Sequence, residues 1–169
     1  VAAPAGAHLR LPPVDPDGDA VSYNYKWIQD GVPSDNAGDV LSAEYTAKEQ
    51  EWTVWVTATD GDLESEIAEA SLTILNAPPT IALSISPESP TTEDDLVSMV
   101  EVVEPDGDDV TLVYTWKKDG GDTGFSEETV NSSATTRDEE WSLQVIANDG
   151  EVDGEPSEIS VTIGNSLPV

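Results

Sequence analysis

The sequence has no cysteine and very little positive charge, and both absences narrow what it can be. Without cysteine, the 169-residue chain can form neither a disulfide nor a thiolate metal site. Six Lys and Arg stand against 35 Asp and Glu, which gives a formal net charge of −29 at pH 7. Nucleic acids are bound through a basic footprint, and anionic membrane surfaces attract basic segments. We therefore expect no nucleic-acid binding and no membrane insertion.

The sequence also has no long apolar run, and it contains a single histidine. No run approaches the roughly 18 residues that a membrane-spanning helix needs. Residues 1–13 lack the charged start and following apolar block of a signal peptide. The one histidine, His8, lies in an irregular Ala- and Pro-rich stretch that offers no means of holding the imidazole of a Ser–His–Asp relay. No Gly-rich phosphate loop occurs either, so we expect a protein that is not an enzyme.

The chain contains an internal repeat with an offset of about 89 residues. The acidic stretch Asp15-Pro16-Asp17-Gly18-Asp19 returns as Glu104-Pro105-Asp106-Gly107-Asp108-Asp109, and each copy precedes a stretch that ends in Tyr-x-Trp. Between residues 15–76 and 104–165, about 22 of 62 positions are identical. The repeat indicates two small domains. We place the first at 1–76, the second at 77–165, and the start of a further linker at 166–169.

Alternating apolar and polar residues predict β-strands without helices. We expect strands at 21–28, 52–58 and 68–75, a short one near Val40-Leu41, and in the second copy strands at 80–86, 110–116, 129–130, 141–147 and 159–163. Inward positions include Val21, Tyr23, Tyr25 and Trp27. Asp30-Gly31 and Asp119-Gly120 predict tight turns. The pattern predicts an all-β fold of two tandem antiparallel Ig-like β-sandwich domains.

The first domain is expected to lack about one N-terminal strand. Residues 1–14 align with 90–103, which we read as a loop followed by a strand. Pro12 and Pro13 cannot donate to a sheet ladder, so the corresponding strand of the first copy should be short or lie at an edge. Nothing in the first copy matches 76–86 of the second. Trp55 falls on the outward face, where it is either a contact surface or half exposed beside a neighbouring strand.

These residues resemble the cadherin-like and immunoglobulin-like tandem repeats of bacterial surface proteins, and more loosely PKD repeats. The matching elements are the Asp-Pro-Asp-Gly-Asp stretch, Arg137-Asp138-Glu139-Glu140-Trp141 before a strand, Ala147-Asn148-Asp149-Gly150 after it, and Asn-x-x-Pro between domains. The resemblance covers 15–165 and implies an extracellular or cell-surface repeat. The sequence departs from it in the linker, which carries fewer acids than cadherin linkers, and in lacking the Gly-Asp-Gly turn of PKD repeats.

The topology of tandem sandwiches gathers acidic residues at one end of a domain, because the loop after the second strand and the last hairpin lie at the same end. For the second domain, the gathered residues are Glu104, Asp106, Asp108, Asp109 and Asp149, with the linker residue Asn76 at the same end. Glu49 and Glu51 of the first domain should approach the junction. The matching set of the first domain is Asp15, Asp17, Asp19 and Asp60.

Ca²⁺ suits such loops because it accepts six to eight oxygens in flexible geometry, whereas Mg²⁺ demands a stricter octahedron. The stretch is not an EF-hand, because the bidentate Glu of that loop is absent from both copies. The alternative is that Asp-Pro-Asp-Gly-Asp is simply a favourable turn.

Three functional hypotheses follow. The first is a structural or adhesive module with Ca²⁺-stiffened junctions, whose partners are neighbouring repeats of the same or identical chains. The second is a filament subunit whose incomplete first domain accepts a strand from another chain. The third is an accessory module of a larger enzyme that binds a protein or glycan ligand through Trp55.

Overall fold

The computed structural model describes residues 15–167, and it divides the chain into two compact units. Unit 1 is Val1–Asn76 and unit 2 is Ala77–Val169. Apart from two short 3₁₀ helices, the regular elements of the described residues are β-strands, and every paired strand is antiparallel to its neighbour. The predicted all-β antiparallel fold class is therefore confirmed.

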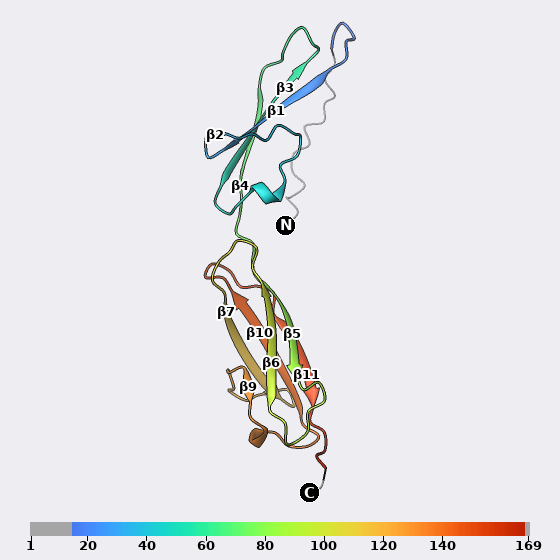
Figure 1. The fold of residues 1–169 in the computed structure, drawn as a ribbon, viewed down its shortest axis with the longest axis vertical. Coiled ribbons are helices and arrows are strands. Elements are labelled where there is room, and N and C mark those ends of the chain that lie inside the picture. The colour runs from blue at the N-terminus through green and yellow to red at the C-terminus, as the bar shows by residue number, and fades with distance from the viewer. Residues whose placement is uncertain (1–14, 168–169) are drawn as a thin grey trace. The chain divides into compact units, whose positions relative to one another are not determined.

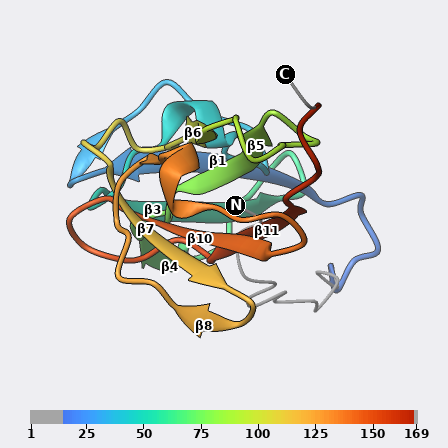
Figure 2. The same cartoon turned by 90° about the horizontal axis from the view of Figure 1, so that it is seen from below.

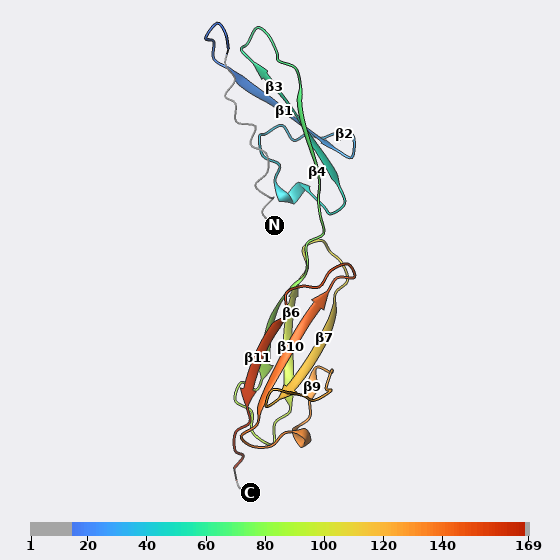
Figure 3. The same cartoon turned by 180° about the vertical axis from the view of Figure 1, so that it is seen from behind.

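Unit 2 is a complete sandwich of two sheets (Figure 1). Its strands are β5 (Thr80–Ser86), β6 (Leu96–Val103), β7 (Thr111–Lys118), β8 (Gly121–Asp122), β9 (Thr129–Val130), β10 (Glu140–Asn148) and β11 (Ser157–Thr162), with the 3₁₀ helix η2 (Ser132–Ala134). One sheet has the order β11-β10-β7-β8 and the other β5-β6-β9. Figure 3 views unit 2 from behind, with β11, β10 and β7 in front of β6, and Figure 2 shows β8 at the edge beside β7.

The core of unit 2 lies between these sheets. Trp116 and Trp141 are at most 1% exposed and pack edge to face, with ring centroids 6.4 Å apart. Around them, one continuous cluster includes Ile85, Leu96, Val130, Leu143, Val145, Val161 and Ile163. Inward residues of β10 alternate with outward ones, as the period of two along a strand requires. Burial of this much apolar surface accounts for the stability of the sandwich.

Unit 1 repeats only one of these sheets within the described residues. Its strands are β1 (Ser22–Gln29), β2 (Val32–Pro33), β3 (Glu51–Thr59) and β4 (Ala68–Thr73), with the 3₁₀ helix η1 (Ala43–Tyr45) between β2 and β3. The order β2-β1-β3-β4 is the same as β8-β7-β10-β11 at the repeat offset. Residues 15–76 contain no counterpart of β5, β6 or β9. The layer that covers the equivalent sheet in unit 2 therefore has no match in this range.

Two detailed expectations for unit 1 were wrong. Val40 and Leu41 form a bend and an irregular segment instead of the short strand predicted from β9. Tyr23, expected in the core, is 43% exposed because no second sheet lies over it in the described residues. The strand expected around Pro12 and Pro13 lies outside the described residues.

The Asp-Gly turns form in both units with the same backbone. Asp30 and Asp119 both have φ of 49°, and Gly31 and Gly120 have φ of 79° and 76°. Two consecutive positive φ values define the two-residue hairpin turn that matches the right-handed twist of paired strands. Each Asp side chain also accepts a hydrogen bond from the backbone N–H of the residue that opens the long strand, Glu51 at 2.8 Å or Glu140 at 3.0 Å.

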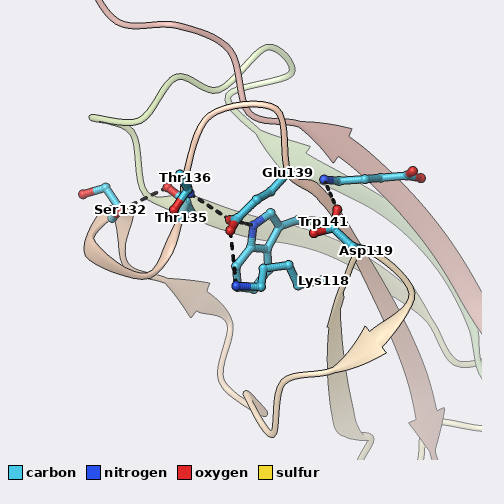
Figure 4. A network of polar contacts seen from close by, with 8 residues as sticks. Lys118, Asp119, Ser132, Thr135, Thr136, Glu139 and Trp141 are labelled. Atoms are coloured by element: carbon cyan, nitrogen blue, oxygen red, sulfur yellow. Dashed lines mark hydrogen bonds and ion pairs between the residues drawn. The ribbon is translucent and has the colours of Figure 1, made fainter.

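A group of polar contacts around the Trp141 indole fixes the start of β10 (Figure 4). The Glu139 carboxylate accepts from the Trp141 indole at 3.1 Å and from the Thr136 N–H at 2.8 Å, and it pairs with the Lys118 ammonium at 3.2 Å. Burial opposes ionisation of Glu139, but these three donors outweigh it and hold the pKa of Glu139 below its usual value. In unit 1, the neutral amide of Gln50 accepts the same two hydrogen bonds, from Trp52 and Ala47.

Candidate metal site

The loop between β6 and β7 brings three acidic side chains together. One carboxylate oxygen from each of Glu104, Asp106 and Asp108 lies within 4.8 Å of the others. All three residues are partly buried. Gly107 has a φ of 84°, which lets the chain reverse between Asp106 and Asp108 so that both side chains lie on the same side as Glu104. Among the described residues, this is the group of acids that meets that spacing.

Glu104 both closes the loop and leaves an oxygen without a donor. Its Oε2 atom accepts hydrogen bonds from the backbone N–H of Gly107 and from that of Asp108, the latter at 2.8 Å. Its Oε1 atom is buried and has no hydrogen-bond partner. A buried carboxylate oxygen without a donor costs about 1–3 kcal/mol or more. The loop geometry is thus explained by Oε2, whereas Oε1 needs a further partner.

Asp106 ties the loop to the first residue of unit 2. Its Oδ2 atom accepts a hydrogen bond of 2.7 Å from the backbone N–H of Ala77, which is itself only 6% exposed. The neighbouring Pro79 is fully buried, and its carbonyl lies so close to Gly154 that a Cβ there would approach it to 2.2 Å. The start of unit 2 is therefore held between the β6–β7 loop and the hairpin that precedes β11.

Asp149 lies at the same end of unit 2, because Asn148 pairs with Thr111 at the ends of β10 and β7. It is 6% exposed, and its Oδ1 atom accepts from the backbone N–H groups of Glu151 at 2.8 Å and Val152 at 2.7 Å. Its carboxylate does not join the group of three, and neither does the exposed Asp109. Asp149 thus organises its own hairpin turn.

The residues of unit 1 that were expected at the junction have local roles. The Asn76 side-chain oxygen accepts a hydrogen bond of 3.4 Å from the Lys48 ammonium. Glu49 has a φ of 68°, and its backbone N–H donates to the Ile74 carbonyl at 2.8 Å. The side chains of Glu49 and Glu51 are both exposed.

The first acidic loop folds differently from the second. The Asp15 Oδ1 atom accepts from the backbone N–H groups of Asp17 at 2.8 Å and Asp19 at 3.2 Å, and the side chains of these two residues are exposed. Asp60 lines the same shallow pocket as Asp15. The N–H groups of Leu63 and Asp62 bind the Asp60 carboxylate and hold the pKa of Asp60 below its usual value. Within 15–76, these four acids do not form a group of three close oxygens.

The spacing in unit 2 matches what one cation requires. Two carboxylates about 5 Å apart repel by roughly 3 kcal/mol at an effective dielectric of 20. Two oxygens that each lie about 2.4 Å from the same Ca²⁺ cannot be more than about 4.8 Å apart, and the three acids satisfy this limit. Three carboxylates leave further positions for water or backbone oxygens, which Ca²⁺ accepts. The donor set is therefore suitable for a hard divalent cation.

Trp55 is half buried on the outer face of the unit 1 sheet. The strand register places it between Lys26 of β1 and Glu69 of β4. Its indole N–H donates to the Glu69 carboxylate at 2.8 Å, and the Lys26 ammonium lies 5.7 Å from the ring centroid. The ring is thus held by its two neighbouring strands, and these contacts give the glycan hypothesis no specific support.

Sequence reasoning missed several contacts that involve the main chain or a distant residue. The backbone N–H of Ala77 carries no side-chain signal that could mark it as the partner of Asp106. A groove lined by Leu112, Tyr114 and residues 126–129 was also not anticipated. In it, burial and the charge of Glu128 raise the pKa of Tyr114. The variable composition of 121–132 gave no pattern from which to find this groove.

Comparisons with known proteins give distant structural similarities and no matching family. No family model matches the chain, and no curated protein matches it. Among solved structures, it is similar to a two fibronectin type III domain segment from chicken tenascin, with 16% identity, a TM-score of 0.36 and 83% of each chain covered. It is also similar to the FN1–FN3 domains of chicken CNTN1, with 13% identity and a TM-score of 0.37, covering 90% of this chain and 60% of that one.

Proposed function

We propose that this chain is a non-catalytic extracellular repeat module, and that the β6–β7 loop of unit 2 binds Ca²⁺. The repeated all-β units support the first part, because modules of this kind serve as spacers in adhesins, stalks and fibres. The charge of −29 also favours an environment in which cations compensate carboxylates. No helix among the described residues is long and apolar enough to cross a membrane.

The observation that carries the Ca²⁺ proposal is the Oε1 atom of Glu104. It is buried without a hydrogen-bond donor, and its carboxyl group belongs to a group of three acids whose oxygens lie within 4.8 Å. A turn alone explains Oε2, which binds two backbone N–H groups, but it supplies nothing to Oε1. A cation would both satisfy this oxygen and remove the repulsion among the three carboxylates.

Binding at this loop would also affect the linker that precedes it. Asp106 is one of the three acids, and its other interaction is with the backbone N–H of Ala77, the first residue of unit 2. A cation that fixes Asp106 would therefore fix the attachment of residue 77. On this basis we propose that Ca²⁺ restricts the linker and stiffens the succession of repeats, and that the neighbouring repeats of the same or identical chains are the partners.

Calorimetric titration of the chain with Ca²⁺ tests the binding. The expected result is saturable binding that Glu104→Gln weakens at least about tenfold, since this substitution removes one carboxylate charge from the ion. The amide oxygen of Gln can still accept from the Gly107 and Asp108 N–H groups, so the loop should keep its fold. The matched control is Asp15→Asn in unit 1, which we expect to leave the binding unchanged.

The absence of binding heat, or binding that Glu104→Gln does not alter, would contradict the proposed site. Stiffening is tested separately by small-angle scattering with and without Ca²⁺. A saturated chain whose scattering profile does not change would remove the stiffening claim and leave the binding site in place.

A further inference from the structure

Strand β7 of unit 2 is fully paired along one edge and only partly paired along the other. On one side it pairs with β10 along its whole length. On the other side, its ladder with β8 contains only its last two residues. One further bond runs on this side from the Trp116 N–H to the Phe125 carbonyl, at 3.3 Å. Over residues 111–115, no other strand of the described part of the chain pairs with this edge.

The backbone groups of Leu112 and Tyr114 face this open edge. In an antiparallel sheet, successive residues of a strand direct their N–H and C=O groups to opposite edges. Trp116 directs its N–H to Phe125, on the side of β8. Tyr114 and Leu112 precede Trp116 by two and four residues, so their backbone groups point the same way. An added strand would find regular ladder partners in both residues.

A groove lies beside the open edge. It has a volume of about 510 Å³ and is lined by Leu112, Tyr114 and residues 126–129. Its second wall forms where the chain leaves β7 and crosses to the opposite sheet, because the Glu128 carbonyl there accepts from the Ser98 N–H at 2.9 Å. The groove therefore offers a backbone edge together with space for side chains.

The edge is uncharged, whereas the rim of the groove is acidic. Proteins often block an exposed edge with Lys, Pro or an inward-pointing charge, but residues 111–115, Thr-Leu-Val-Tyr-Thr, contain none of these. The charged residues that line the groove are Glu127 and Glu128, which are both exposed. Burial and the charge of Glu128 raise the pKa of Tyr114, so the negative potential reaches the wall of the groove.

We infer that this edge and groove bind an extended, positively charged segment of a partner protein, which adds to β7 as a further strand. Main-chain hydrogen bonds to Leu112 and Tyr114 hold the segment, and a Lys or Arg side chain lies against Glu127 or Glu128. A second copy of this chain suits the groove poorly, because each copy carries a net charge of −29. The inference is independent of Ca²⁺ binding.

Amide hydrogen exchange followed by NMR tests the pairing, with the acetylated and amidated peptide Thr-Lys-Val-Lys-Val-Thr as the probe. In the free chain, the amides of Leu112 and Tyr114 (the edge amides) should exchange at least about tenfold faster than those of Val113 and Thr115, which face β10. Saturating peptide should slow the edge amides about tenfold and leave the other two unchanged. A control peptide with the same charges, N-methylated at its four central amides, should have no effect.

Variants of the acidic rim test the expected charge of the partner. Replacing both rim residues, Glu127→Gln with Glu128→Gln, should weaken peptide binding at least about fivefold. The matched control is Glu155→Gln with Glu158→Gln, which removes two exposed charges elsewhere in unit 2 and should leave binding unchanged. Equal binding to both double variants, or binding that does not slow the edge amides, would overturn the inference. So would edge amides that already exchange slowly in the free chain, because residues 1–14 or a second copy would then cover the edge.

Discussion

The two repeats of this chain share a sheet but differ in what lies against it. In both units, a central Trp pair packs edge to face at 6.4 Å, an Asp-Gly turn closes the first hairpin, and a polar side chain supports the indole of the long strand. Unit 2 adds β5, β6 and β9 and forms a continuous buried hydrophobic cluster, against which further inward residues pack partly buried. The comparison shows that the four-stranded sheet is specified locally, whereas the core depends on the second layer.

The largest expected difference between the two units is in the free energy of unfolding that each loses when its central Trp is replaced with Ala. Trp116→Ala should destabilise unit 2 by about 3–5 kcal/mol, because Trp116 is fully buried. Trp27→Ala should cost unit 1 clearly less, because Trp27 is only partly buried. Urea unfolding followed by residue-resolved NMR reports on each unit separately. Equal costs in the two units would show that the face of unit 1 is covered in solution.

The next difference is in the response to acid. The folded pKa of Glu139 lies below its ordinary value of 4.5, so its contribution is fully present above that value and is lost as the pH falls towards the folded pKa. Unit 2 should therefore lose stability below about pH 4.5, and Glu139→Gln should remove this component while costing about 1 kcal/mol at pH 7. Thermal unfolding from pH 7 to pH 3 measures both effects.

Unit 1 provides the matched control, because Gln50 supports Trp52 without a titrating group. Its counterpart of Lys118 is Gln29. Gln50→Glu should introduce a new pH dependence into unit 1. A wild-type unit 2 whose acid response is identical to that of Glu139→Gln would contradict the assigned role of Glu139.

The smallest difference concerns the two 3₁₀ helices. The Asn131 side chain caps η2 by accepting from the Ser133 N–H at 3.0 Å, whereas Ser42 makes no side-chain cap to η1. Asn131→Ala should cost about 0.5–1 kcal/mol, and Ser42→Ala close to nothing. Chemical denaturation of the two variants checks this, and a larger loss from Ser42→Ala would show that the caps had been assigned to the wrong unit.

Much of the fold could be predicted because it rests on local pattern. The period of two located the long strands, and the Asp-Gly pairs located the turns, since only a few residue types tolerate two positive φ values. The short strand at Val40-Leu41 was predicted wrongly. Its counterpart in unit 2, β9, is stabilised by pairing with β6. No counterpart of β6 lies within 15–76, so the ladder that would stabilise this strand is missing.

The acidic site was less predictable for a related reason. Sequence spacing placed Glu104, Asp106 and Asp108 in one loop, and the structure brings them together. The same spacing in the first copy does not gather three carboxylates. Asp15 is one methylene shorter than Glu104; both accept from the equivalent N–H of Asp19 or Asp108, but the second donor to Asp15 is the Asp17 N–H, whereas the second donor to Glu104 is the Gly107 N–H. The participation of Asp149 and Asn76 remains a prediction. In this structure Asp149 accepts from the Glu151 N–H, and Asn76 accepts from Lys48.

The central claim is that near-identical acidic loops differ in cation binding because only the second gathers three carboxylates. Gly18 and Gly107 occupy equivalent positions with similar φ values of 89° and 84°, and their amides serve as paired probes. In a Ca²⁺ titration followed by ¹H–¹⁵N NMR, we expect saturating shifts at Gly107 and its loop, with Gly18 unchanged over the same range. Shifts of equal size at both glycines, or at neither, would contradict the account.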